Sequence, residues 1–265
     1  MRGFTAIVVG LVMGLVGSFA YAADDVVQTV GHGQINWTDG VITATGSGAP
    51  NLKAANVAVA RLGAERSAKL DAFRNILETV RGARISGAGD VSALLGTSPQ
   101  LQSQIQGMVR NFRVNDTKYY SDGGVDVIVS IPLNGVLFGT LVPATGTKVT
   151  PATGPSGTTG IVIQAKGLKV VPALAPRIVD PDGNDVFSAA FVSAASARAQ
   201  GVVAYVNSLD AAMKHSRVAD KPLIIKAQKL VAPGSSDLVV SEADAGRIRT
   251  LGAVVAAGKV IIVTD

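Results

Sequence analysis

Hydrophobic and polar side chains alternate in two pairs of short runs within the first half of the chain. The first pair surrounds Thr38-Asp39-Gly40 in the stretch GQINWTDGVITATG, and an Asp-Gly step between β-rich segments is a strong hairpin signal. The second pair, Phe112 to Tyr120 and Val125 to Leu133, flanks the turn residues 121–124. Apolar residues two apart on its return strand predict one buried face. We therefore predict two antiparallel hairpins.

Between these hairpins the apolar period changes to that of a helix. Small and apolar residues recur every fourth position from about Asn51 to Arg81, which predicts one long helix with a narrow stripe. The residues of this stripe are Ala60, Ala64, Ala68, Ala72, Ile76 and Val80. A second helix is expected from Ser98 to Arg110, with Ser98 as its cap and Pro99 at its first position. The predicted fold is α+β, with a long and a shorter helix packed on an antiparallel sheet.

A composition change divides the chain. Residues 143–160 read PATGTKVTPATGPSGTTG, and such Gly, Pro, Thr and Ser content is typical of a linker. We therefore predict an α+β domain at 23–142 and a second domain at 161–265. Strands and helices alternate in the second domain, which indicates an α/β or α+β fold. Its expected strands are 160–165, an irregular strand at 169–179, 222–231 and 260–264; its expected helices lie within 189–214 and at 241–257, the latter capped by Ser241.

The first 22 residues have the pattern of a secretory signal peptide. Arg2 precedes an apolar run from Phe4 to about Phe19, and Ala20-Tyr21-Ala22 forms a small-x-small cleavage site. The run is shorter than the roughly 20 apolar residues that a membrane span requires. The sequence contains no cysteine, which excludes disulfides, Cys-ligated metals and a lipidated Cys. We expect an exported periplasmic or outer-membrane-associated protein without a direct lipid anchor.

Charge is distributed unevenly between the two predicted domains. Residues 23–145 hold ten Lys or Arg and ten Asp or Glu, whereas residues 146–265 hold thirteen and nine, a net charge of +4. The cations of the second half are spread singly, which is typical of a solvated face, although an acidic partner is the alternative. Nucleic acid is not an expected partner of an exported protein.

The glycine-rich stretch from Ala44 to Asn51 precedes the long helix and invites comparison with a phosphate-binding loop. A P-loop needs a Lys followed by Ser or Thr, and a dinucleotide site needs three spaced glycines and a later acid. Neither of these sets of residues follows the glycines here, and Pro50 lacks the N–H that a phosphate would use. We interpret Gly46 to Pro50 as a turn that steers the chain into the helix.

The remaining candidate groups do not form a recognisable site. His32 and His215 have no ligand-spaced partner, and His215 is expected to end a helix and interact with its dipole. The acidic stretch Asp180 to Asp185 resembles a calcium loop, but position 12 of that loop is Phe191, so we favour a β-turn. No G-x-S-x-G stretch is present. The sequence therefore predicts no catalytic residue, no cofactor and no metal, and a protein that is not an enzyme.

The alanine stripe and its surroundings resemble a known family. Gly46, Gly48, Ala54-Ala55 to Arg61, the Ala64, Ala68 and Ala72 repeat, and Leu77, Val80 and Gly82-Ala83-Arg84-Ile85 are similar to the Lpp-twenty-type bacterial envelope lipoproteins. That family includes flagellar basal-disk lipoproteins and is related to the N-terminal domain of a periplasmic flagellar assembly protein. The resemblance covers Trp37 to Leu133. It implies a non-enzymatic envelope protein with a long helix on an antiparallel sheet, although the lipidated Cys of the family is missing here.

These observations favour an exported envelope scaffold or assembly protein that binds protein partners, itself included, with the flagellar base as one such assembly. The alternative is a basic C-terminal module that binds anionic envelope material such as peptidoglycan or lipopolysaccharide. The sequence leaves open the partner, the oligomeric state, a truly flagellar role, the function of the C-terminal domain and whether the two domains pack together.

Overall fold

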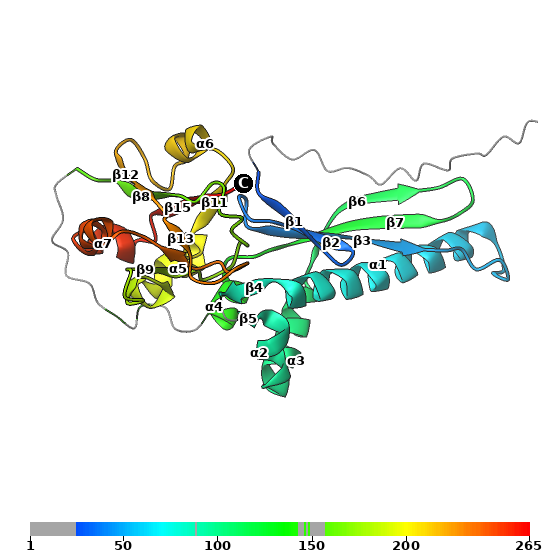
Figure 1. The fold of residues 1–265 in the computed structure, drawn as a ribbon. Coiled ribbons are helices and arrows are strands. Elements are labelled where there is room, and N and C mark those ends of the chain that lie inside the picture. Colours follow the sequence, from blue (N-terminus) through cyan, green and yellow to red (C-terminus); the bar gives the residue numbers. More distant parts are fainter. Residues whose placement is uncertain (1–24, 88, 143–145, 147, 149–156) are drawn as a thin grey trace, which may run out of the picture.

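The computed structural model describes residues 25–87, 89–142, 146, 148 and 157–265 (Figure 1). The predicted signal peptide and most of the predicted linker lie outside the described residues. Two domains lie side by side, and the chain contains both helices and sheets as predicted. The connection from β3 to α1 and the turn from β6 to β7 lie at the end of the N-terminal domain farthest from the C-terminal domain (Figure 1).

The N-terminal domain is built on a five-stranded antiparallel sheet of order β1-β2-β3-β7-β6. Both predicted hairpins are confirmed, because β2 pairs with β3 across the Asp39-Gly40 turn and β6 pairs with β7 across residues 120–124. Gly40 has a φ of +66°, which a glycine adopts without strain. The strands are β1 (Val27–Val30), β2 (Gly33–Asn36), β3 (Val41–Gly48), β6 (Arg113–Tyr119) and β7 (Val125–Pro132).

Helix α1 (Val57–Gly82) lies along one face of this sheet (Figure 1). The predicted start at Asn51 is wrong by six residues. Asn56 has extended backbone and its side chain accepts a hydrogen bond from the Val59 N–H at 2.9 Å, so the cap lies at residue 56. The alanine stripe is confirmed, since Ala64, Ala68 and Ala72 are fully buried against the sheet.

The glycines before α1 have a different role from the predicted one. Gly46 and Gly48 belong to strand β3, so the expected loop from Ala44 to Asn51 is wrong over most of its length. A Cβ at Gly46 would lie 2.0 Å from the Ala72 nitrogen, and one at Gly48 would lie 1.9 Å from the Ala64 oxygen. The two glycines therefore allow strand and helix backbones to touch.

A helical branch packs against the C-terminal part of α1, on the side away from the sheet (Figure 1). It consists of α2 (Val91–Gly96) and α3 (Pro99–Val109), preceded by the short hairpin of β4 (Arg84–Ser86) and β5 (Gly89–Asp90). The predicted cap of α3 is confirmed, since Ser98 Oγ accepts a hydrogen bond from the Leu101 N–H at 3.3 Å. Helix α4 (Val136–Leu141) completes the domain.

The C-terminal domain contains a four-stranded parallel sheet of order β11-β15-β8-β12 and a four-stranded mixed sheet of order β10-β9-β14-β13. The parallel strands are β8 (Gly160–Gln164), β11 (Ala204–Val206), β12 (Pro222–Lys226) and β15 (Val260–Val263); the mixed strands are β9 (Ile178–Val179), β10 (Asp185–Phe187), β13 (Lys229–Leu230) and β14 (Leu238–Val239). The helices are α5 (Ala194–Gln200), α6 (Leu209–Lys214), α7 (Glu242–Arg249) and α8 (Gly252–Ala256), with a 3₁₀ turn at Ala189–Phe191.

Four predicted intervals of this domain differ in detail from the observed elements. The interval 189–214, within which a helix was expected, holds two, α5 and α6, because Gly201 with a φ of +77° ends α5 and residues 204–206 then pair with β15. The strand expected at 222–231 divides between the two sheets, and the helix expected at 241–257 divides at Leu251. Within the irregular strand expected at 169–179, only the last two residues pair.

The two domains pack together, which the sequence left open. The Leu174 and Ala175 N–H groups donate to the carbonyl oxygens of Arg84 and Ile85 at 2.9 and 2.7 Å. The Gly135 N–H donates to the Arg198 carbonyl oxygen at 2.8 Å. Apolar side chains of both domains also form one continuous core. Backbone hydrogen bonds thus join the domains at two separate places.

Candidate functional site

The glycine-rich stretch contains no anion site in the structure. Its Ser47 N–H donates to Asp71 Oδ2 at 2.9 Å, and Ser47 Oγ donates to Asp126 Oδ1 at 2.7 Å. The first turn of α1 lies nine residues beyond Gly48. A phosphate at this stretch would therefore meet two carboxylates and no helix N-terminus.

The acidic stretch Asp180 to Asp185 forms the predicted turn. Asp180 Oδ1 accepts hydrogen bonds from the Asp182 and Asn184 N–H groups at 3.1 and 2.8 Å, and Asp180 Oδ2 lies 2.6 Å from Arg249 Nη2. Burial opposes ionisation of this carboxyl, but the hydrogen bonds from Asn184 and Arg249 lower its pKa below the ordinary value. Over the described ranges, no group of three or more His, Cys, Asp or Glu side chains has the arrangement of a metal site.

The two histidines lie in different domains and have different surroundings. His32 Nδ1 is 3.9 Å from Glu78 Oε2, and both side chains are exposed. His215 follows the last residue of α6, as predicted. Its Nδ1 accepts a hydrogen bond from the Arg217 N–H at 3.1 Å, and burial together with the Arg217 charge lowers its pKa. The surroundings of His215 therefore favour its neutral form.

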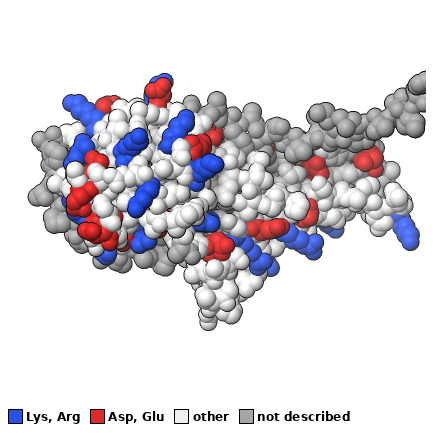
Figure 2. Space-filling model, viewed as in Figure 1, with Lys and Arg blue, Asp and Glu red and all other residues white. Residues whose placement is uncertain are grey.

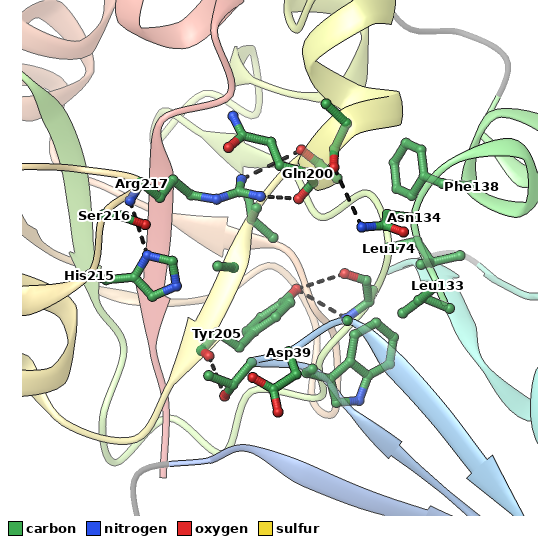
Figure 3. Close-up of a pocket in the computed structure, with 18 residues that line it drawn as sticks. Asp39, Leu133, Asn134, Phe138, Leu174, Gln200, Tyr205, His215, Ser216 and Arg217 are labelled. Carbon is green, nitrogen blue, oxygen red and sulfur yellow. Dashed lines mark hydrogen bonds between the residues drawn. The ribbon is translucent and has the colours of Figure 1, made fainter. Parts of the chain in front are cut away.

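A cavity of about 280 Å³ lies where the two domains meet (Figure 3). The N-terminal domain contributes the β2–β3 turn and the segment before α4, and the C-terminal domain contributes the end of α5, β11 and the loop after α6. The lining residues are Trp37, Thr38, Asp39, Gly40, Leu133, Asn134, Phe138, Ala173, Leu174, Ala199, Gln200, Gly201, Val203, Ala204, Tyr205, His215, Ser216 and Arg217.

Tyr205 fixes one wall of this cavity. Its hydroxyl donates to the Ala173 carbonyl oxygen at 2.9 Å and accepts from the Ala173 N–H at 3.0 Å. The Trp37 ring meets the Tyr205 ring edge-on, with centroids 5.8 Å apart. Thr38 Oγ1 donates to the Tyr205 carbonyl oxygen at 2.7 Å. Burial raises the pKa of Tyr205 far above its usual value, so the hydroxyl stays protonated and acts as a structural donor.

Arg217 lies on the opposite side, and its buried guanidinium contacts carbonyl oxygens rather than a carboxylate (Figure 3). Nη1 donates to Gly258 at 2.7 Å and to Val202 at 3.3 Å, and Nη2 donates to Gln200. These carbonyls lie at or just after the C-terminal ends of α5 and α8, where the helix dipoles place negative charge. Burial lowers the pKa of Arg217 to about 10, so the group remains charged at neutral pH and holds the two helix ends together.

The polar groups at the mouth of the cavity are also used in packing. Asn134 Nδ2 donates to the Ala199 carbonyl oxygen at 3.4 Å, and Gln200 Nε2 donates to the Ala257 carbonyl oxygen at 2.8 Å. Asp39 Oδ2 accepts from Asn36 Nδ2 at 2.9 Å. Within the described lining, no hydroxyl and histidine form a hydrogen-bonded nucleophile and base pair. The cavity therefore has the character of a domain junction.

Sequence reasoning did not identify Trp37, Tyr205 or Arg217 as a group. Trp37 is the single tryptophan of the chain and precedes the Asp-Gly turn, a position that could have marked it. Tyr205 lies in the interval within which a helix is expected, and Arg217 is one cation among many in the sequence. The pairing of β11 with β15 places Tyr205 against the N-terminal domain, and no local sequence pattern predicts this pairing.

Comparison with known proteins concerns the C-terminal domain. Residues 160–265 match a family model described as Treponema pallidum Tp0624, second domain. This part of the chain is therefore similar to a domain of a bacterial protein, and the match supports the two-domain organisation. No curated protein matches the chain. The helices of the described residues include none with the length and apolar content of a membrane span.

Proposed function

We propose that this protein is an exported, non-enzymatic scaffold or assembly protein of the bacterial envelope. Its function would lie in surfaces that bind protein partners, with the flagellar base as one candidate assembly. The cavity at the domain junction fits this proposal, because Thr38 and Asn134 in its lining bond across the two domains and its other polar groups are used in packing. The resemblance over Trp37 to Leu133 points the same way.

The observation that carries the proposal is a group of exposed apolar side chains on α1 and just before it. The alanine stripe of this helix is buried against the sheet, yet five apolar residues in this region are between 50% and 93% exposed. They are Leu52, Val57, Val59, Leu62 and Leu70. At about 100° per residue, Val59, Leu62 and Leu70 lie on one face of α1 away from the alanine stripe, and apolar residues exposed on one face are typical of a protein contact.

A second copy of this chain fits that face. The N-terminal domain carries ten cations and ten anions over residues 23–145, so net charge does not oppose its self-association. Burying a leucine side chain in an interface contributes about 1.5–3 kcal/mol, and two such residues from each copy would stabilise a dimer substantially.

The test is the molar mass of the exported protein measured by light scattering during size exclusion, together with cross-linking in intact envelopes. We expect a mass above that of one chain, and a Leu62→Lys, Leu70→Lys variant should shift towards one chain. Ser67→Lys is the matched control, because Ser67 is an exposed polar residue of the same helix. A wild-type monomer without any cross-linked envelope partner would contradict the proposal.

The segregation of charge in the C-terminal domain favours a second candidate function, binding of anionic envelope material. Around α7, five carboxylates form ion pairs with four cations: Asp180, Asp185, Asp237, Glu242 and Asp244 pair with Lys148, Arg177, Arg247 and Arg249. The positive excess of this domain therefore lies elsewhere. Binding to lipopolysaccharide or peptidoglycan should weaken steeply with added salt, and salt-independent binding would exclude this function.

A further inference from the structure

The turn after β8 holds two lysines in a fixed position. It runs from Ala165 to Lys169, and the carboxylate of Asp265 accepts hydrogen bonds from the Gly167 N–H at 2.8 Å and the Lys169 N–H at 3.1 Å. Lys166 Nζ also donates to the Asn207 carbonyl oxygen at 3.3 Å, across the end of β11. Both lysine side chains are exposed. The backbone of this turn is therefore clamped while the charges face solvent.

Lys169 has a φ of +54°, in the left-handed region that favours glycine. Ala219, with a φ of +53°, is its one non-glycine counterpart among the described residues. A side chain in this region costs stability, and glycine or asparagine would fit with less strain. Such an outlier is a reason to look for a function of the side chain, and here that side chain carries a positive charge.

Two further lysines lie at the neighbouring strand ends. Lys226 is the last residue of β12 and pairs in register with Gln164, the last residue of β8. The next residue, Ala227, donates its N–H to the Gln164 carbonyl oxygen at 2.9 Å. Lys229 then begins β13. The carboxyl ends of β8 and β12 therefore bring lysines 166, 169, 226 and 229 to one edge of the domain. Within the described residues none of these four forms a salt bridge.

Half-exposed apolar side chains accompany these lysines. Ile224 is two residues before Lys226 in the same strand and is 41% exposed, and Val231 is two residues after Lys229 and is 46% exposed. Figure 2 shows Lys and Arg side chains over the β8, β12 and β13 face of the domain, with acidic side chains near α7 and a few others among the basic ones, including near the C-terminus. The edge thus sets four lysines against one carboxylate, that of Asp265, and combines this positive excess with apolar contact area.

We propose that this lysine edge, defined as Lys166, Lys169, Lys226 and Lys229 with Ile224 and Val231, docks on an anionic lipid surface. The inference rests on the proposed envelope location and specifies the anionic material of the second candidate function. Lysine is a point charge that suits phosphate groups in varied orientations, and apolar side chains beside it can enter the headgroup region. A soluble polyanion would use the lysines but would leave Ile224 and Val231 without a role.

The test is co-sedimentation of the full chain with vesicles of phosphatidylglycerol and phosphatidylcholine, compared with phosphatidylcholine alone. Every variant keeps the same N-terminus, so any binding by residues 1–24 is common to all. Lys169→Gly removes the charge and relieves the strained backbone; we expect an unchanged or higher melting temperature and about five-fold weaker binding to the anionic vesicles, as for one lysine near a membrane. Ala219→Gly relieves the comparable strain without a charge change and should bind like wild type.

Three further variants separate the contribution of charge from that of apolar contact, and thereby a lipid surface from a soluble polyanion. Lys169→Arg keeps the charge and should retain binding. A Lys226→Gln, Lys229→Gln variant should bind about 25-fold more weakly, if each lysine contributes about five-fold. Ile224→Ser should weaken binding to vesicles while leaving binding to soluble polyphosphate unchanged.

The proposal is overturned if Lys169→Gly binds as wild type, if Ile224→Ser has no effect on vesicle binding, or if vesicles without anionic lipid bind equally well. Light scattering on the same samples reports self-association. Loss of the lipid interaction with assembly intact would therefore refute this inference and leave the scaffold proposal standing.

Discussion

Substitution of Gly46 by alanine tests the contact on which the N-terminal domain depends. The new Cβ would lie 2.0 Å from the Ala72 nitrogen and 2.3 Å from the Ala68 oxygen, whereas ordinary van der Waals contact begins near 3.4 Å. Both neighbouring atoms are backbone, so no side chain can rotate away. Helix and strand must therefore separate by roughly 1.4 Å, the difference between the 3.4 Å of ordinary contact and the 2.0 Å from the new Cβ to the Ala72 nitrogen.

That separation would loosen the row of buried residues between α1 and β3. A radial gap of about 0.5–1 Å already removes a quarter to a half of the attraction between contacting atoms. Overpacking of a core costs about 1–3 kcal/mol, and a rigid backbone contact lies at or above the upper end. We therefore expect Gly46→Ala to lower the free energy of unfolding by about 3 kcal/mol and the melting temperature by about 6–12 °C.

The assay is urea and thermal unfolding followed by circular dichroism, with Gly63→Ala as the control. Gly63 lies within α1 and a Cβ there meets no atom within 4 Å. Its replacement should stabilise the helix by about 0.5–1 kcal/mol, because alanine loses less backbone entropy than glycine. If Gly46→Ala unfolds within about 0.5 kcal/mol of wild type, the close backbone packing described above is refuted.

Two further predictions concern buried charges of the C-terminal domain. Arg217→Met should lower the free energy of unfolding by about 3 kcal/mol, because the carbonyls at two helix ends lose their donors; thermal unfolding measures this, and an unchanged melting temperature would argue against the clamp. The pKa of Asp180 is lowered in the folded protein, so its contribution to stability should be present above about pH 4 and disappear as the pH falls through the folded pKa. Asp180→Asn should lower stability at pH 7 and flatten this acid dependence in urea titrations from pH 7 to pH 2; an equally steep dependence would show that other carboxyls cause it.

Much of the N-terminal domain follows from local pattern. Alternation over residues 125–131 and the Asp39-Gly40 turn specify strands and a hairpin, because side-chain direction reverses at each strand residue and glycine accepts the turn conformation. Recurrence of alanine every fourth residue specifies one narrow helix face. The start of α1 was misplaced because Asn51 and Asn56 are both able to cap, and the capping geometry selects Asn56.

The C-terminal domain was predicted less well because its short elements depend on long-range pairing. Residues 204–206 form a strand only because β15, more than 50 residues later, lies beside them. The segment from Pro222 to Leu230 is continuous in sequence but contributes to two sheets. The pattern of a single sequence cannot distinguish these cases, since both read as short apolar runs.

The sequence by itself determined the two-domain organisation, the hairpins and the small-residue face of the long helix, since each depends on neighbours along the chain. Tertiary structure alone decided that Gly46 and Gly48 are contact residues rather than a turn, that Trp37, Tyr205 and Arg217 meet at the domain junction, and that four separated lysines share an edge. The physical reason is the same in all three cases. Each depends on the approach of segments distant in sequence, and that approach is set by packing and strand pairing over the whole molecule.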